Sequence, residues 1–142
     1  MIKILKPDLS TDIDLLLYSS KVQAGFPSPA EDHIEAKLDF NKYLIDHPAA
    51  TFLTRVVGNS MINAGIYEND ILVVDRSLEA TDNKIIVAVV NNELTVKRLK
   101  YINGKAFLVP ENDEYKSIAI EPGGDSDSIY IWGVVISVIR KL

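Results

Sequence analysis

The sequence of 142 residues contains no cysteine, which excludes disulfide bonds and metal sites with thiolate ligands. It has only two histidines, His33 and His47, and they form no recognised metal-binding motif. Both lie in polar segments, so we expect surface histidines rather than members of a Ser-His-Asp triad. The sequence therefore predicts no metal and no cofactor.

Long apolar runs are also missing, because no stretch approaches the roughly 18 apolar residues of a membrane-spanning helix. The opening MIKILKPDLS has too short an apolar run, and charges too early, for a signal peptide. We expect a cytoplasmic protein with one domain, or one domain with an arm, and no contact with a membrane.

Positive charge is scarce. The formal net charge is −5, although 47% of the residues are hydrophobic and can supply a core. The one dense basic cluster comprises Lys97, Arg98, Lys100 and Lys105. Since DNA-binding proteins rely on several phosphate contacts, we expect no direct binding to DNA.

The second part of the chain is rich in β-branched and apolar runs separated by short turns. The run KIIVAVV (84–90) is continuously apolar, as in a strand that is covered on both faces. Asn103-Gly104 is a strong hairpin signal. The expected strands lie within residues 51–58, 70–75, 84–90, 93–102, 106–110, 117–120 and 129–142. The predicted fold is mostly β: a curved antiparallel sheet or partly open barrel of about seven strands, with a short helix and an extended N-terminal arm.

The predicted domain organisation has three parts: an arm (1–24), a tether with a short helix (25–50) and a β-rich domain (51–142). Asp39 is a plausible N-cap for the helix FNKYLID. Its apolar residues Phe40, Tyr43 and Leu44 share one face, which we expect to point toward a core.

The stretch KVQAGFPSPAED (21–32) follows neither a helical nor a strand period. Pro27 and Pro29 fix the backbone in an extended form. Two interpretations remain open for this stretch: an inert linker, or a substrate that is held extended.

A sharp turn after the first strong strand could carry chemistry. The strand ends at Gly58, and Ser60-Met61 follow. A serine at such a junction can expose its hydroxyl, and neighbouring backbone N–H groups can face an oxyanion. A plain turn serine fits the same pattern.

A nucleophilic serine needs a base, and a lysine made neutral by burial could serve. In ELTVKRLKYI, Lys97 shares a strand face with Leu99, which could remove it from water. The spacing alone does not favour Lys97 over Lys100 or Lys84, and a solvated lysine remains an alternative.

Three motifs stand in order along the chain: AGFPSPAED, GNSM and LTVKRL. Together they resemble the LexA-like self-cleaving serine peptidases, and more closely the SOS mutagenesis branch of that family than its repressors. The resemblance covers nearly the whole chain, including the opening ILKPDL and the closing IWGVVISVI.

The resemblance implies a Ser/Lys peptidase that cuts itself. It implies Ser60 as nucleophile, Lys97 as general base and Ala24-Gly25 as the cleaved bond, with the backbone at Ser60 and Met61 as the possible oxyanion site. Alanine at position 24 is typical of LexA-type sites, whereas the mutagenesis branch often has cysteine there.

The resemblance also implies partners. The expected trigger is a RecA nucleoprotein filament, and the shortened form is expected to serve a UmuC-like catalytic subunit of an error-prone translesion DNA polymerase. A homodimer is expected as well.

Three alternatives compete with this interpretation. A LexA-like repressor needs a helix-turn-helix before the cleavage site, and 24 residues are too few for one. A signal-peptidase-like enzyme needs a membrane anchor, and none is visible in the sequence. A catalytically inactive β-module that only binds partners stays open, because the sequence does not give the distance between Ser60 and Lys97.

Overall fold

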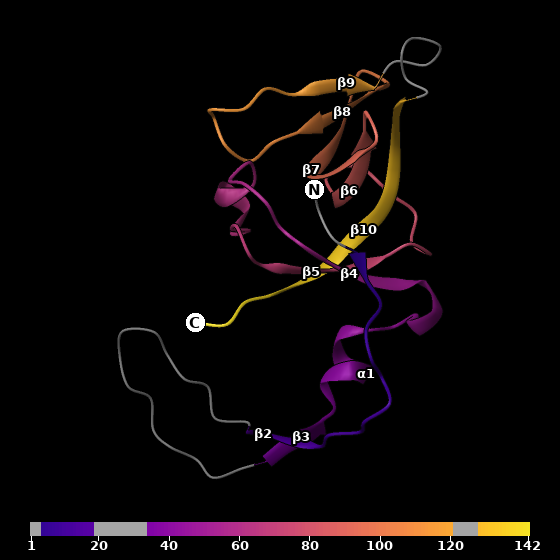
Figure 1. Cartoon of the computed structure of the whole chain (residues 1–142), viewed down its shortest axis with the longest axis vertical. Coiled ribbons are helices and arrows are strands. Elements are labelled where there is room, and N and C mark those ends of the chain that lie inside the picture. The colour runs from indigo at the N-terminus through magenta and orange to yellow at the C-terminus, as the bar shows by residue number, and fades with distance from the viewer. Residues whose placement is uncertain (1–3, 19–33, 121–127) are drawn as a thin grey trace. The chain divides into compact units, whose positions relative to one another are not determined.

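The computed structural model describes residues 4–18, 34–120 and 128–142, and its main element is one antiparallel sheet of eight strands (Figure 1). In spatial order the strands are β1 (Ile4–Leu5), β4 (Thr51–Arg55), β5 (Ile71–Asp75), β10 (Ile129–Ile139), β6 (Ile85–Val90), β7 (Glu93–Ile102), β8 (Lys105–Val109) and β9 (Ile118–Ile120).

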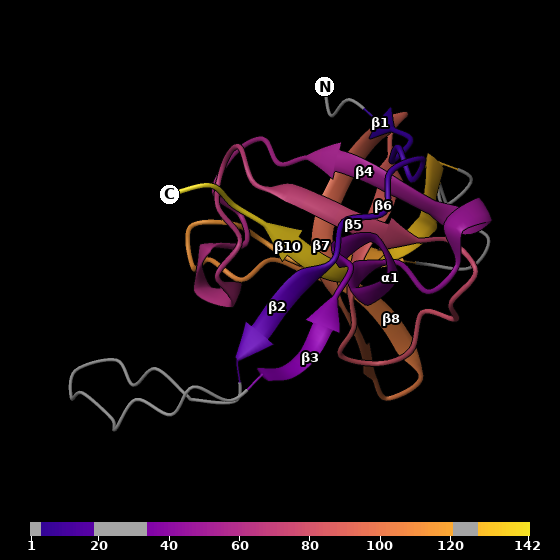
Figure 2. The same ribbon diagram turned by 90° about the horizontal axis from the view of Figure 1, so that it is seen from below.

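The predicted fold class is confirmed: the protein is mostly β, and its large sheet is antiparallel and not closed. Each of the seven expected runs corresponds to one of the strands β4 to β10, although β8 begins one residue earlier than expected, at Lys105. The eighth strand, β1, comes from the predicted arm and pairs with β4 at the sheet edge (Figure 2). Asn103 and Gly104 both have positive φ, 51° and 79°, as a tight hairpin turn between β7 and β8 requires.

β10 joins the two halves of the sheet, since it first pairs with β6 and then continues along β5 (Figure 1). The register shifts between Ile131 and Gly133, where β10 passes close to β5. A Cβ on Gly133 would lie 2.6 Å from Cγ1 of Val74, so only glycine fits at this crossing.

β6 is buried on both faces, as its apolar run predicts. Ile86 and Ala88 belong to one buried cluster, while Val87 between them belongs to the other. The first cluster also contains Leu99, Leu108 and Val134. The second also contains Val56, Met61, Ile66, Leu72, Val74 and Val96. Alternate residues of one strand thus hold together two cores.

The chain divides into two compact units, Met1–Pro7 with His47–Leu142, and Asp8–Asp46. The smaller unit contains an antiparallel pair, β2 (Leu15–Tyr18) and β3 (Ile34–Leu38), followed by helix α1 (Phe40–Leu44).

The cap of α1 is as predicted, because the Asp39 carboxylate accepts a hydrogen bond from the Asn41 amide at 2.9 Å. The expected burial of the helix face is wrong for two residues. Phe40 and Tyr43 are 55% and 60% exposed, and the chain instead buries Ile45 just after the helix. A five-residue helix is too short for its apolar residues to cover a core in the way the period suggested.

Two short 3₁₀ helices complete the larger unit: η1 (Pro48–Ala50) and η2 (Ile62–Ala64). Among the described residues, no helix has the length and apolar character needed to cross a membrane. His33 and the predicted cleavage site Ala24-Gly25 lie outside the described residues.

Candidate active site

Ser60 lies in the turn between β4 and η2. Gly58 has φ +85°, a left-handed conformation that other residues adopt only with strain. Met61 is buried (1% exposed) and belongs to the core, whereas Ser60 is only partly buried. The turn is therefore anchored by Met61, and Ser60 next to it stays accessible.

The loop after β8 holds this turn in place through two residues. The Glu111 amide donates to the Ser60 carbonyl at 2.8 Å, and the Asn63 amide donates to the Glu111 carbonyl at 2.9 Å. The Asn112 side-chain amide donates to the Asn59 carbonyl at 2.8 Å. Asn112 is only 9% exposed, so its hydrogen bond is shielded from water.

Lys97 reaches Ser60 from β7. Its Nζ lies 3.0 Å from the Ser60 Oγ, 2.8 Å from the Thr95 Oγ1 and 3.0 Å from the Val96 carbonyl oxygen. The structure therefore brings the two sequence-predicted residues, 37 positions apart, within hydrogen-bond distance.

The surroundings of Lys97 disfavour its charge. Lys97 is 7% exposed, and no acidic side chain in the described part of the chain forms an ion pair with it. Burial lowers the pKa of the Lys97 ammonium from its ordinary value of 10.5. A neutral amine has two N–H donors and one lone pair. It can donate to Thr95 and Val96 while its lone pair faces the Ser60 hydroxyl.

The other candidate bases lie elsewhere. Lys84 is exposed, and Lys100 donates to the Asn83 side chain. His47 is exposed, as predicted, and its Nδ1 lies 2.6 Å from Oδ2 of the buried Asp75. Neither lysine nor His47 contacts Ser60.

The predicted oxyanion site has free donors within the described structure. The backbone N–H groups of Ser60 and Met61 donate to no acceptor among residues 4–18, 34–120 and 128–142. Two neighbouring amides without acceptors beside a hydroxyl are what an oxyanion site requires.

Sequence reasoning did not identify the supporting residues Thr95, Glu111 and Asn112. The same strand period that put Lys97 and Leu99 on one face also places Thr95 there, so a signal for Thr95 was present. No local signal marks Glu111 or Asn112, because they act across a contact between distant loops.

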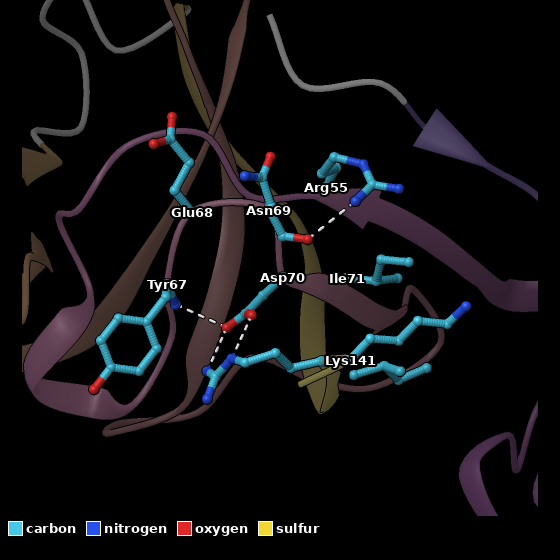
Figure 3. A pocket seen from close by; sticks show the side chains of 9 residues that line it. Arg55, Tyr67, Glu68, Asn69, Asp70, Ile71 and Lys141 are labelled. Atoms are coloured by element: carbon cyan, nitrogen blue, oxygen red, sulfur yellow. Dashed lines mark hydrogen bonds and ion pairs between the residues drawn. The ribbon is translucent and has the colours of Figure 1, made fainter.

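A separate pocket of about 620 Å³ lies in the larger unit (Figure 3), and neither Ser60 nor Lys97 is among the residues that line it. In it the Arg140 guanidinium donates two hydrogen bonds of 2.6 Å to the Asp70 carboxylate, and the Tyr67 amide donates a third of 2.8 Å. The pocket is lined by Arg55, Tyr67, Glu68, Asn69, Asp70, Ile71, Ile139, Arg140 and Lys141.

Comparison with known proteins matches residues 16–136 to the Peptidase S24-like family. Protein MucA of Salmonella typhimurium is 43% identical over 118 residues, which cover 83% of this chain and 79% of MucA. Protein ImpA of Escherichia coli is 42% identical over 125 residues, covering 88% and 83%. The LexA repressor of Glaesserella parasuis is 38% identical over 138 residues, covering 97% of this chain and 65% of the repressor. Because the family match spans most of the chain and includes both Ser60 and Lys97, the chain belongs to the Peptidase S24-like family.

Proposed function

We propose that the chain is a self-cleaving serine peptidase of the UmuD type, which cuts its own Ala24-Gly25 bond with Ser60 as nucleophile and Lys97 as general base. The observation that carries the proposal is the 3.0 Å separation of the Ser60 Oγ and the Nζ of a buried lysine. A buried lysine without a carboxylate partner is suited to accept a proton.

The first step transfers the Ser60 hydroxyl proton to the neutral Lys97 amine. The Ser60 Oγ then forms a bond with the carbonyl carbon of Ala24, and the carbonyl electrons move to its oxygen. The backbone N–H groups of Ser60 and Met61 stabilise this oxyanion. The new ammonium of Lys97 keeps its contacts with the oxygens of Thr95 and Val96.

The second step breaks the bond between Ala24 and Gly25. The Lys97 ammonium returns its proton to the departing nitrogen of Gly25, leaving an ester between Ala24 and Ser60. Water then attacks the ester while Lys97 accepts one proton from it. The ester bond breaks, the proton goes from Lys97 to the Ser60 Oγ, and Ala24 leaves as a carboxylic acid that releases its remaining proton to solvent as a carboxylate forms.

The substrate properties of the cleavage stretch follow from its residues. Gly25 has no side chain to obstruct the approach of the scissile carbonyl. Pro27 and Pro29 favour an extended backbone, which suits a peptide bound across a site. The attachment of the stretch to the same chain gives it a high effective concentration.

Membership of the Peptidase S24-like family supports the following proposal for the biological setting. A RecA nucleoprotein filament stimulates the cut, and residues 25–142 then act as an accessory subunit of a UmuC-like error-prone translesion polymerase. The protein works as a cytoplasmic homodimer and does not bind DNA directly. Support comes from the identity of 43% and 42% to MucA and ImpA.

The experiment follows fragments of purified protein over time by mass spectrometry, at pH 10 and at neutral pH with the filament. We expect two fragments, one of which begins at Gly25. Ser60→Ala and Lys97→Ala abolish the cut. Lys100→Ala is the matched control, because Lys100 lies on the same strand but bonds Asn83 instead, and this variant cleaves at the normal rate.

Three outcomes would overturn the proposal. A new N-terminus other than Gly25 contradicts the assigned bond, and cleavage by the Ser60→Ala variant contradicts the nucleophile. If the native chain stays uncut under all conditions, the alternative of a LexA-like β-module that only binds partner proteins replaces the peptidase.

A further inference from the structure

The edge of the large sheet is covered by a very short strand. β1 pairs with β4 through two residues only, Ile4 opposite Thr54 and Leu5 opposite Leu53. Ile4 and Leu5 remain 40% and 45% exposed, so their burial stabilises the pairing little. Something besides apolar contact must hold this segment on the edge.

The next residue, Lys6, supplies that contact. Its Nζ donates to three backbone carbonyl oxygens, those of Pro48 at 2.9 Å, Ala49 at 3.1 Å and Thr51 at 3.1 Å. The same Nζ lies 4.3 Å from the centre of the Phe52 ring. Three acceptors and an aromatic face satisfy a primary ammonium completely, and we call these four residues the ammonium cage.

The backbone around the cage carbonyls is held by contacts that do not involve Lys6. The buried Thr51 donates its hydroxyl to the His47 carbonyl at 2.7 Å, and the Ala50 amide donates to the same carbonyl at 3.0 Å. The Arg76 amide donates to the Ala50 carbonyl at 2.9 Å. The cage is therefore preorganised by the turn from η1 into β4.

The aromatic wall of the cage is held in the same way. The Phe52 ring contacts the Trp132 ring edge-on, with 5.5 Å between ring centres. The Arg76 guanidinium lies 4.5 Å from the centre of the Trp132 ring, and its Nε donates to the Trp132 carbonyl at 2.8 Å. Strands β4 and β10 thus fix the ring that Lys6 covers.

The β1 segment, which covers this edge, is covalently connected to β4 only through a long intervening part of the chain. Between Pro7 and His47 the chain forms the separate unit Asp8–Asp46. The segment Ile4–Lys6 therefore behaves as a ligand supplied by the same chain, whose binding is favoured by the covalent link rather than by a large contact area.

We propose that the β4 edge with its ammonium cage is a binding site for an extended segment of a partner protein that carries two apolar residues followed by lysine. The partner strand adds to β4 as β1 does, and its lysine enters the cage in place of Lys6. The chemistry of the cage selects for a cation such as lysine: a carboxylate would be repelled by three carbonyl oxygens, and a neutral side chain cannot donate three hydrogen bonds.

The availability of this site rests on the proposed function, because a cut between Ala24 and Gly25 removes the covalent link between Lys6 and the sheet. The cut converts an intramolecular pairing into a bimolecular one that dilution can reverse. The site itself exists in the uncut chain and can be tested there.

The test uses the full chain with Ser60→Ala, so that every sample stays uncut. The probe is a fluorescent peptide of residues 1–10, MIKILKPDLS, and the control peptide carries Lys6→Met. Three proteins are compared by fluorescence anisotropy: Ser60→Ala alone, Ser60→Ala with Lys6→Glu, and that double variant with Phe52→Leu. Thermal unfolding confirms that each protein is folded.

We expect the probe to bind the Lys6→Glu protein at least about tenfold more tightly than the protein with native Lys6, whose own segment competes. The Met peptide binds the Lys6→Glu protein about tenfold more weakly than the probe, and Phe52→Leu weakens the probe severalfold. Equal binding of the two peptides, or no gain on Lys6→Glu, overturns the proposal. None of these results depends on cleavage, so an uncut native chain would overturn the proposed function alone.

Discussion

Lys97 and Arg140 are basic side chains in two regions of the larger unit, and they differ in their partners. The Lys97 Nζ lies among uncharged oxygens, and Lys97 as a residue is only 7% exposed. Arg140 is 40% exposed and donates to the buried carboxylate of Asp70. Burial lowers the pKa of Lys97, whereas the hydrogen bonds to Asp70 raise the pKa of Arg140.

This contrast indicates how one fold can give two basic side chains different roles, one chemical and one structural. A buried cation without a counter-ion loses its proton easily and becomes a base. A cation paired with a carboxylate keeps its charge and fastens the chain instead. Arg140 also donates to the Gly65 carbonyl at 2.7 Å, so it connects the C-terminal end of the chain to the loop that follows Ser60.

The largest effect comes from giving Lys97 a counter-ion. Thr95→Asp places a carboxylate where the Thr95 hydroxyl lies 2.8 Å from the Lys97 Nζ. An adjacent opposite charge raises a lysine pKa by about two units, so self-cleavage at pH 7 slows about 100-fold. The measurement is the rate of appearance of the Gly25 N-terminus.

Thr95→Asn is the matched control for this variant, because it has nearly the same shape without the charge. We expect the Asn variant to cleave much faster than the Asp variant. Equal rates for the two would mean that the charge of Lys97 does not control the reaction.

A smaller effect tests the position of Ser60 without changing any charge near Lys97. Asn112→Ala removes the hydrogen bond to the Asn59 carbonyl and loosens the turn that carries Ser60. We expect about a tenfold slower cut, since small displacements of a nucleophile are costly. The midpoint of the pH–rate curve should not move, because the surroundings of Lys97 are unchanged.

The exposed neighbour Asp113 provides the control for position, and Asp113→Ala should cleave at the normal rate. A shifted pH midpoint in Asn112→Ala would contradict a purely positioning role for Asn112.

The smallest effect concerns stability at the paired site. Hydrogen bonds from Arg140 outweigh burial and hold the pKa of Asp70 below its ordinary value of 3.8. Between that lowered pKa and 3.8 the unfolded chain binds more protons than the folded protein. The stabilisation is therefore complete above pH 3.8 and is lost as the pH falls through the folded pKa.

Asp70→Asn should lower the Tm by about 5 °C at pH 7, and the gap to the native protein should close below pH 3.8. Calorimetry across this pH range measures it. If the difference in Tm between the two proteins stays constant as the pH falls below 3.8, the Asp70 carboxylate contributes no charge-dependent stability.

How far the sequence predicts this protein depends on whether the signal is local. The apolar run of β6 and the Asn103-Gly104 turn are local patterns, and both predictions are confirmed. β1 and β3 were not predicted, because two to five residues give no usable period and their pairing depends on distant partners.

The site was predictable to the same extent. The period of β7 placed Lys97 in an apolar environment, but only the family motifs selected it over Lys100 and Lys84. The catalytic roles of Ser60 and Lys97 remain predictions, although their proximity is observed. The bond between Asn112 and Asn59 spans 53 residues and has no sequence signature.

The central claim is that Lys97 is a neutral amine at a pH where an ordinary lysine is charged. The most direct measurement follows the Lys97 side-chain signals by NMR as a function of pH, in the uncut Ser60→Ala protein labelled at lysine. The account predicts a midpoint clearly below 10.5 in the folded protein and a return toward 10.5 when urea unfolds it. A midpoint at or above 10.5 in the folded protein would contradict the account.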